Sequence, residues 1–175
     1  MIVKYGARFR GNGVSSGYTP KVYPKVGDTP TQRQKAERLE RAMLHLPQAD
    51  CPVRHYFAPG LYAREMTIPQ GVTVTGAVHK TEHLIVVSMG LLRVSTEDGW
   101  RDVAAGETII CKPGMKNAVH ALKDSRWTNF LPNPDNITNT DRLTELFTES
   151  KASELLGGAD NKQLLANKAA ERIEA

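Results

Sequence analysis

Turn signals recur at short intervals through the middle of the chain, and they constrain the fold more than any other feature. They stand at 59–60 (PG), 69–71 (PQG), 89–90 (MG), 97–99 (EDG), 104–106 (AAG) and 112–114 (KPG). The segments between them are short, apolar or alternating, and show no helical period. Short strands separated by such turns are typical of a β sandwich or barrel. The sequence therefore predicts an all-β domain over residues 53–131.

Helical patterns flank this domain on both sides. Before it, Thr29 is the expected N-cap of a helix over residues 29–47, with Gln32 completing a capping box and Pro47 ending the helix. Its apolar face is Ala36, Leu39, Met43 and Leu46. After the domain, residues 132–175 read as a helical extension with two helices, one over 141–156 and one that starts after Asp160.

Residues 1–28 read as an extended arm, because Gly, Ser and Pro are frequent there and no core-forming pattern is present. Within residues 1–30 there are five basic residues against Asp28, whereas the remaining chain carries 18 basic and 18 acidic residues. An arm that meets an acidic surface would explain this excess, and a solvated tail of ordinary charge is the alternative. Nucleic acid is less favoured than a protein surface, because a net charge of +4 is small for phosphate tracking. The candidate partner-binding residues are Lys4, Tyr5, Arg8, Arg10, Tyr18, Lys21, Tyr23 and Lys25.

Several classes of function find no support in the residues. Cys51 and Cys111 are the only cysteines, which makes a disulfide scaffold or a CxxC metal site unsupported and favours a reducing compartment. We expect no membrane span, because no apolar run approaches the ~18–20 residues that one needs. There is no P-loop, no G-x-S-x-G, no H-E-x-x-H and no dinucleotide-binding fingerprint.

Two histidines four residues apart, His79 and His83, are the candidate site. Side chains alternate between faces along a strand. If His79 points inward, Thr81, His83, Ile85 and Val87 should point inward too, and Leu84 and Val86 outward. Both sets contain apolar residues, so we expect this strand to be covered on both faces, on one side by the interior and on the other by a second layer or a sister subunit.

The same stretch resembles the first motif of the cupins, through Gly76, His79 and Gly90. Gly106, Pro113 and Gly114 resemble the second cupin motif. The resemblance covers roughly residues 56–131. It implies a mainly β, double-sheet barrel of the jelly-roll type, with an arm, one N-terminal helix and two C-terminal helices added to it.

The resemblance also implies a site with four metal ligands, and this chain departs from it. Ala77 takes the place of the first histidine, His83 that of the glutamate, and Asn117 falls about where the last histidine should be. His120 is the one further candidate ligand, although it should point outward if Asn117 points inward. A transition metal usually needs three or four protein ligands. The candidate pocket-lining residues are Tyr62, Arg64 and Asn117.

A narrower resemblance runs from about residue 60 to 149. The segments "REMTIPQG", "HKTEH", "TEDG", "KPG" and "KDSRWTN" are similar to those of cupin-like proteins encoded by tailed bacteriophages. The resemblance carries no enzymatic role. It implies a structural protein, made in the cytoplasm of a bacterial host and found in the virion as a head or tail accessory.

The sequence therefore leaves three hypotheses. The first is a non-enzymatic phage structural protein without a cofactor, with copies of itself and other virion proteins as partners. The second is a metal-dependent cupin enzyme that uses His79 and His83 to bind Fe, Mn or Zn and acts on a small molecule. The third is a small-molecule sensor that binds a ligand in the barrel without chemistry.

Overall fold

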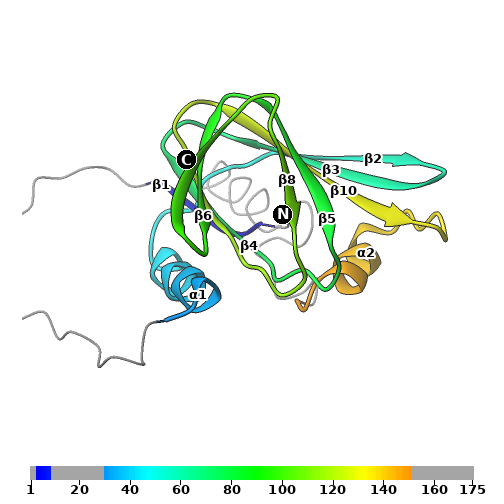
Figure 1. Cartoon of the computed structure of the whole chain (residues 1–175), viewed down its shortest axis with the longest axis horizontal. Helices are drawn as coiled ribbons and strands as arrows, with labels where there is room; N and C mark the ends of the chain where they lie inside the picture. Colours follow the sequence, from blue (N-terminus) through cyan, green and yellow to red (C-terminus); the bar gives the residue numbers. More distant parts are fainter. Residues whose placement is uncertain (1–2, 9–29, 151–175) are drawn as a thin grey trace, which may run out of the picture.

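The computed structural model describes residues 3–8 and 30–150, and their strands form two antiparallel sheets that face each other (Figure 1). Sheet A has the order β1-β4-β9-β6-β7. Its strands are β1 (Val3–Arg8), β4 (Val72–Gly76), β9 (Ala118–Ala121), β6 (Leu91–Thr96) and β7 (Gly99–Ala104).

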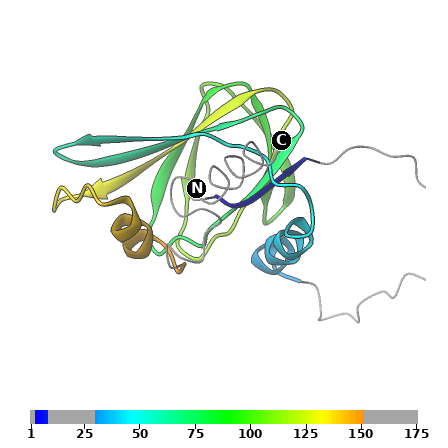
Figure 2. The same cartoon turned by 180° about the vertical axis from the view of Figure 1, so that it is seen from behind.

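Sheet B has the order β2-β3-β10-β5-β8. Its strands are β2 (Val53–Ala58), β3 (Gly60–Ile68), β10 (Ser125–Asn133), β5 (His83–Met89) and β8 (Thr108–Cys111). The two sheets confirm the predicted double-sheet barrel. The β2–β3 hairpin and the end of β10 extend beyond the barrel, as the views from both sides show (Figures 1 and 2).

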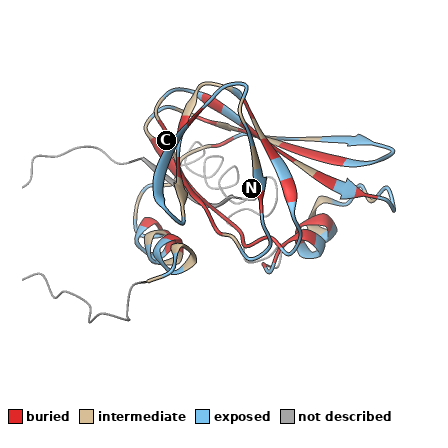
Figure 3. Ribbon diagram, in the orientation of Figure 1, coloured by how far each residue is buried: buried red, intermediate tan, exposed pale blue. Residues whose placement is uncertain are grey.

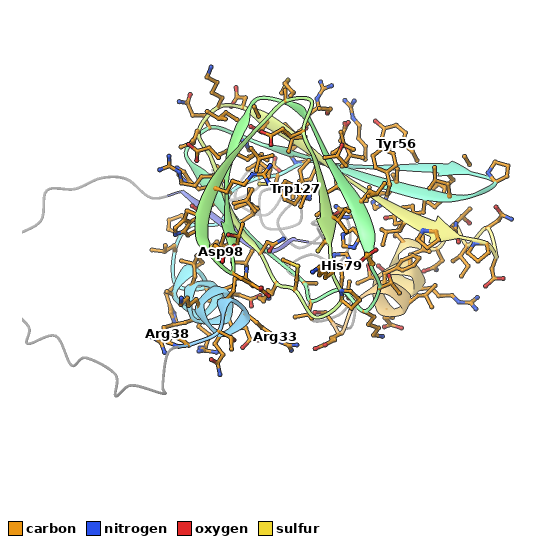
Figure 4. All side chains as sticks on the ribbon, viewed as in Figure 1. Arg33, Arg38, Tyr56, His79, Asp98 and Trp127 are labelled. Carbon is orange, nitrogen blue, oxygen red and sulfur yellow. The ribbon has the colours of Figure 1, made fainter. Side chains whose placement is uncertain are left out.

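The space between the sheets is filled by apolar side chains from both of them. Trp127 of β10 lies fully buried between the sheets (Figure 4), together with Met66, Val74, Ile85 and Leu92. Buried and exposed residues alternate along several barrel strands (Figure 3), as the period-2 pattern of the sequence predicts. The alternation of His83, Ile85 and Val87 inward and Leu84 outward is therefore confirmed.

The chain crosses from sheet B to sheet A at Gly90, where the backbone φ is 84°. A Cβ at this position would lie 2.2 Å from the Asp124 carbonyl oxygen and from Ser125 Oγ. Only glycine combines this left-handed φ with such a close approach. The glycine that ends the expected first motif is thus required by packing at the corner of the barrel.

Helix α1 (Gln32–Met43) begins two residues later than predicted. Thr31 is the N-cap, and it forms a capping box with Gln34 rather than the expected Thr29–Gln32 box. Two overlapping T-x-x-Q patterns exist here, and the structure uses the second one. The helix also ends at Met43, before Pro47 is reached.

Helix α2 (Thr140–Phe147) lies under the part of sheet B that extends beyond the barrel (Figure 1). Leu143 and Phe147 pack against Tyr62 and Leu131 in a second apolar cluster. The predicted helix over 141–156 is therefore too long, because Thr148 adopts an extended conformation and ends it. The second predicted C-terminal helix lies outside the described residues.

The N-terminal segment is not entirely irregular, in contrast to the prediction. Residues Val3–Arg8 form edge strand β1, which pairs with β4 from Val3↔Gly76 to Arg8↔Val72. Backbone pairing to an open sheet edge does not require an alternating apolar pattern, so composition gave no sign of it. Lys4, Tyr5 and Arg8 lie on this strand, whereas Arg10, Tyr18, Lys21, Tyr23 and Lys25 are outside the described residues.

Candidate functional site

His79 precedes β5 and is held in place by backbone contacts on both sides. The backbone of His79 forms an isolated antiparallel bridge with that of Thr148, and the His79 carbonyl accepts a 2.8 Å hydrogen bond from the Gly114 amide. Its neighbours are bonded to the end of α2, through Lys80 N to Phe147 O (2.8 Å) and Glu149 N to Val78 O (2.9 Å). These contacts replace regular strand pairing, and Thr81 is exposed as a result, contrary to the predicted alternation.

The rings of His79 and His83 nevertheless meet inside the molecule, with centroids 4.1 Å apart and planes tilted by 33°. His79 is 3% exposed and His83 is 4% exposed. Figure 4 places His79 at the lower end of the barrel, near α2. The expectation that His79 and His83 both point inward is therefore correct.

The two rings differ in their partners. His83 lies with Nε2 3.3 Å from Asn129 Oδ1 and Nδ1 3.3 Å from the Thr81 carbonyl. Among the residues that the structure describes, His79 has no hydrogen-bond partner at either ring nitrogen. An imidazole that is buried without partners is costly, so His79 is the least satisfied polar group of this site.

Burial keeps both rings neutral. It lowers the pKa of His79 well below the usual value, and the neighbouring His83 acts in the same direction. Burial also lowers the pKa of His83 to about 4. Both rings are thus unprotonated near neutral pH, which is the state that a metal ligand requires.

The hollow beside the pair is very small. Its volume is about 10 Å³. A volume on the order of 10–15 Å³ holds one water molecule, whereas sites for small molecules span roughly 300–1,000 Å³. The residues that line the hollow are Gly76, Ala77, His79, His83, Ile85, Cys111, Met115, Asn117 and Asn129.

The ligands around the hollow do not fit a metal centre. Within residues 3–8 and 30–150, no group of three His, Cys, Asp or Glu side chains could hold a metal ion. Cys111 lines the hollow, but burial raises the pKa of its thiol and so disfavours the thiolate that binds metals. Two neutral imidazoles remain, which is fewer than the three or four ligands of most protein metal sites.

Asn117 is on the wall of the hollow, as predicted, but its side-chain oxygen is already engaged. It accepts a 3.2 Å hydrogen bond from the side-chain nitrogen of Gln32, which belongs to α1. Next to it, buried Lys116 forms a 2.8 Å ion pair with buried Glu40 and donates to the Gly76 carbonyl at 2.8 Å. Helix α1 is therefore fastened to this end of the barrel by polar contacts.

The other predicted pocket residues lie elsewhere on the inner face of sheet B. Tyr62 packs against α2, and its hydroxyl oxygen lies 2.7 Å from His55 Nδ1. Arg64 is buried, at 1% exposure, but does not line the hollow. Asn129 does line it and was missed, although its place between inward Trp127 and Leu131 could have identified it.

His120 is separated from the pair, because it lies on the outer face of sheet A. Its Nδ1 is 2.9 Å from Thr73 Oγ1. Both residues line a groove of about 650 Å³ beside α1, together with the bonded pair Arg93 and Asp102. His120 therefore cannot complete a ligand set with His79 and His83.

The helices of the described part of the chain are not membrane spans, since neither is long and apolar enough to cross a bilayer.

No protein-family model matches this sequence, and no curated protein matches it. Solved structures with a similar fold include the Cupin_2 domain of an XRE family transcriptional regulator from Enterobacter cloacae, with 13% identity and a TM-score of 0.43. That match covers 49% of this chain and 99% of the domain. A cupin-2 domain containing protein from Shewanella frigidimarina has 14% identity and a TM-score of 0.40, over 55% of this chain and 92% of that one. A cupin superfamily protein from Desulfitobacterium hafniense has 8% identity and a TM-score of 0.42, over 52% and 84%.

Proposed function

We propose that this chain is a non-enzymatic, cupin-fold structural protein of a bacteriophage, which assembles into the virion or docks on it as a head or tail accessory. Its partners are copies of itself and other virion proteins, bound through the arm and the helices. The observation that carries the proposal is the state of the site where a cupin enzyme would work. There the hollow has a volume of about 10 Å³ and two neutral histidines.

The surroundings of the hollow support a structural role. A catalytic site needs access for a substrate and groups placed to act on it. Here Gln32 engages Asn117, and the end of α2 is bonded to the segment that carries His79. These contacts connect the barrel to both helices, to α1 through the Asn117 side chain and to α2 through the backbone on either side of His79.

The proposed place of action is the virion, and the basic arm is the proposed contact with other particle proteins. The phage-type sequence segments over about residues 60–149 support this context. The excess positive charge of residues 1–30 supports an acidic protein surface as the target of the arm.

The test is whether the protein travels with particles. Particles purified on a density gradient from an infected culture should contain the chain, as detected by mass spectrometry. Replacing Tyr18, Lys21, Tyr23 and Lys25 with alanine should remove it from the particles, whereas replacing the exposed residues Lys112 and Lys123, which lie outside the arm and the helices, should not. This design leaves β1 intact, which a deletion of residues 1–28 would not do. Normal incorporation of the arm variant would contradict the proposal.

A metal-dependent enzyme that acts on a small molecule through His79 and His83 is the second candidate. The observation that favours it is the pair of ring nitrogens of His79 that lack a partner within residues 3–8 and 30–150. Metal analysis of the purified protein separates the two candidates. Stoichiometric Fe, Mn or Zn that is lost in the His79→Ala, His83→Ala double variant would favour the enzyme, and metal-free protein would reject it.

A further inference from the structure

A single row of side chains crosses the outer face of sheet B from edge to edge. The register pairs Tyr56 with Ala63, Ala63 with Phe130, Phe130 with Leu84, and Leu84 with Ile110. All five strands thus contribute one apolar residue to the same line, which we call the apolar row.

Three of the five members of the apolar row are open to solvent, whereas Ala63 is buried. Tyr56 is 47%, Leu84 48% and Ile110 59% exposed. Helix α2 packs against Tyr62 and Leu131, which belong to the opposite face of the same strands. Figure 4 shows Tyr56 pointing away from α2. The strand of Leu84, which should be covered on both faces, is therefore covered on its inner face and exposed on its outer face.

The relief of this face is uneven. A groove of about 380 Å³ lies over Ala63 of β3, the smallest residue of the row, and it continues across central strand β10 to Val86 and Ser88 of β5. Tyr56 and Phe130 are in its walls. On the other side of β10, Leu84 and Ile110 project from β5 and β8. The face thus has a hollow and a projection at equal distances from its central strand.

A hollow and a projection placed in this way are complementary to a second copy of the same face. A two-fold axis parallel to β10, passing beside Phe130, places β5 of one copy over β3 of the other. Leu84 of each copy then lies over Ala63 of the other, and Ile110 lies over Tyr56. Sheets pack face to face at ~10 Å with their strands within about 30° of each other, and an isologous contact of this kind closes as a dimer.

The size of the face is at the upper end of the apolar patches that monomers expose. Strands at ~4.8 Å spacing and three rows ~7 Å apart give a projected area on the order of 450 Å², and the relief of the side chains adds to it. Monomers rarely expose an apolar patch larger than a few hundred Å², and a standard interface buries about 800 Å² per partner. The two flanking rows, which include Leu61 and Pro132 on one side and Glu65, Thr128 and Val86 on the other, are already part of this area, so the interface is smaller than the standard one.

We propose that the outer face of sheet B is the interface of a two-fold symmetric dimer, with Leu84 of each copy seated over Ala63 of the other. The partner in this proposal is a second copy of the chain. The proposal rests on the structural function proposed above only for the biological purpose of the dimer. Because the test uses purified protein alone, its result is independent of binding to particles.

The first test is the oligomeric state of the full chain, measured by analytical ultracentrifugation over a dilution series. We expect a dimer, and Leu84→Glu should raise its dissociation constant by about 100-fold or more, because the carboxylate would be buried without a partner. The matched control is Trp100→Glu, which places the same charge at a 56% exposed apolar residue of sheet A. It should leave the dissociation constant unchanged. Circular dichroism checks that both variants fold.

The second test addresses the seating of Leu84 over Ala63. Ala63→Leu alone fills the hollow and Leu84→Ala alone removes the projection, so each should weaken the dimer by about 10-fold or more. The double variant exchanges hollow and projection and should return to within about 3-fold of the parent, since the coupling of two contacting residues is measured in this way. A chain that is monomeric at about 100 µM, a dimer insensitive to Leu84→Glu, or a double variant without recovery would each overturn the proposal.

Discussion

Two regions of this molecule reverse the usual distribution of polar and apolar groups, and they do so in opposite directions. At the end of the barrel, polar side chains are buried, including His79, His83 and the Glu40–Lys116 ion pair. On the outer face of sheet B, Tyr56, Leu84 and Ile110 of the apolar row are exposed. Buried polar groups cost stability unless they are paired, whereas exposed apolar groups cost the isolated fold little and favour association.

The comparison indicates where each region acts. The polar end holds the barrel and its helices together, so changes there should alter the stability of the single chain. The apolar row contributes little to that stability and should act between chains. The following predictions test this division, and they are measured by denaturant unfolding at concentrations too low for dimerisation.

The largest effect is expected at the buried ion pair. Lys116→Ala leaves the carboxylate of Glu40 buried without its partner, and should lower the free energy of unfolding by about 3–5 kcal/mol. The double change Glu40→Leu, Lys116→Met should remain within ~1 kcal/mol of the parent, because a packed apolar pair replaces the charges. As a control, Arg33→Ala breaks an exposed pair with Glu149 and should cost under ~1 kcal/mol. A small loss in Lys116→Ala would mean that the polar end does not hold α1 on the barrel.

Acid should destabilise the protein through the histidine pair. The pKa of His83 is about 4 in the folded chain, against about 6.5 when unfolded, so the unfolded chain binds more protons between these values. The free energy of unfolding should therefore fall as the pH drops from about 6.5 to about 4, by ~3 kcal/mol from His83 alone. His79 acts in the same direction, because its pKa is lowered as well.

Two variants separate this effect from other titrations. His83→Gln should reduce the loss on acidification, whereas His120→Gln, at the outer face of sheet A, should keep it. A free energy of unfolding that stays constant between pH 7 and pH 5 would show that the pair is not buried as described.

A smaller effect of the opposite sign is expected at His79 itself. His79→Leu removes two buried ring nitrogens that have no partner in the described part of the chain. Stability should be unchanged or should rise by up to ~1 kcal/mol, because an unsatisfied polar group is replaced by an apolar one. A loss above ~2 kcal/mol would instead indicate that a water molecule or an ion satisfies these nitrogens in the native protein.

The smallest effect is expected in the apolar row. Ile110→Thr changes a 59% exposed side chain and should alter the stability of the monomer by less than ~0.5 kcal/mol. Val87→Thr, on the inner face of neighbouring β5 and fully buried, should cost ~1–3 kcal/mol, because it buries a hydroxyl in the core. If Ile110→Thr cost as much as Val87→Thr, the outer face would be part of the core and the comparison would fail.

The strands were the most predictable part of the fold, for a local reason. The turn at Asp98–Gly99 links β6 to β7 as expected, and the period-2 pattern placed Ile85 and Val87 inside. Helix ends were less predictable. Thr29 and Thr31 both begin a T-x-x-Q pattern, and α1 uses Thr31, which leaves Gln32 to reach Asn117. The end of α2 is set by the pairing of Thr148 with His79, a contact between distant parts of the chain.

The candidate site was predictable in composition but not in arrangement. The sequence identified His79 and His83 as inward residues and Asn117 as a replaced ligand position. It did not identify Asn129 as a partner of His83, because that contact depends on β10 lying beside β5. Nor did the helical pattern of α1 predict that Glu40 is buried, since its partner Lys116 lies far from it along the chain.

By itself, the sequence determined the spacing of the strands within the β domain, the inward faces of most of their side chains and the incomplete ligand set, because these depend on neighbouring residues and on residue type. Only the tertiary structure decided that the hollow is too small for a substrate. It also brought Tyr56, Ala63, Phe130, Leu84 and Ile110 into one row across sheet B. The physical reason is that sheet register joins residues far apart in the chain, and no local pattern records which strands lie side by side.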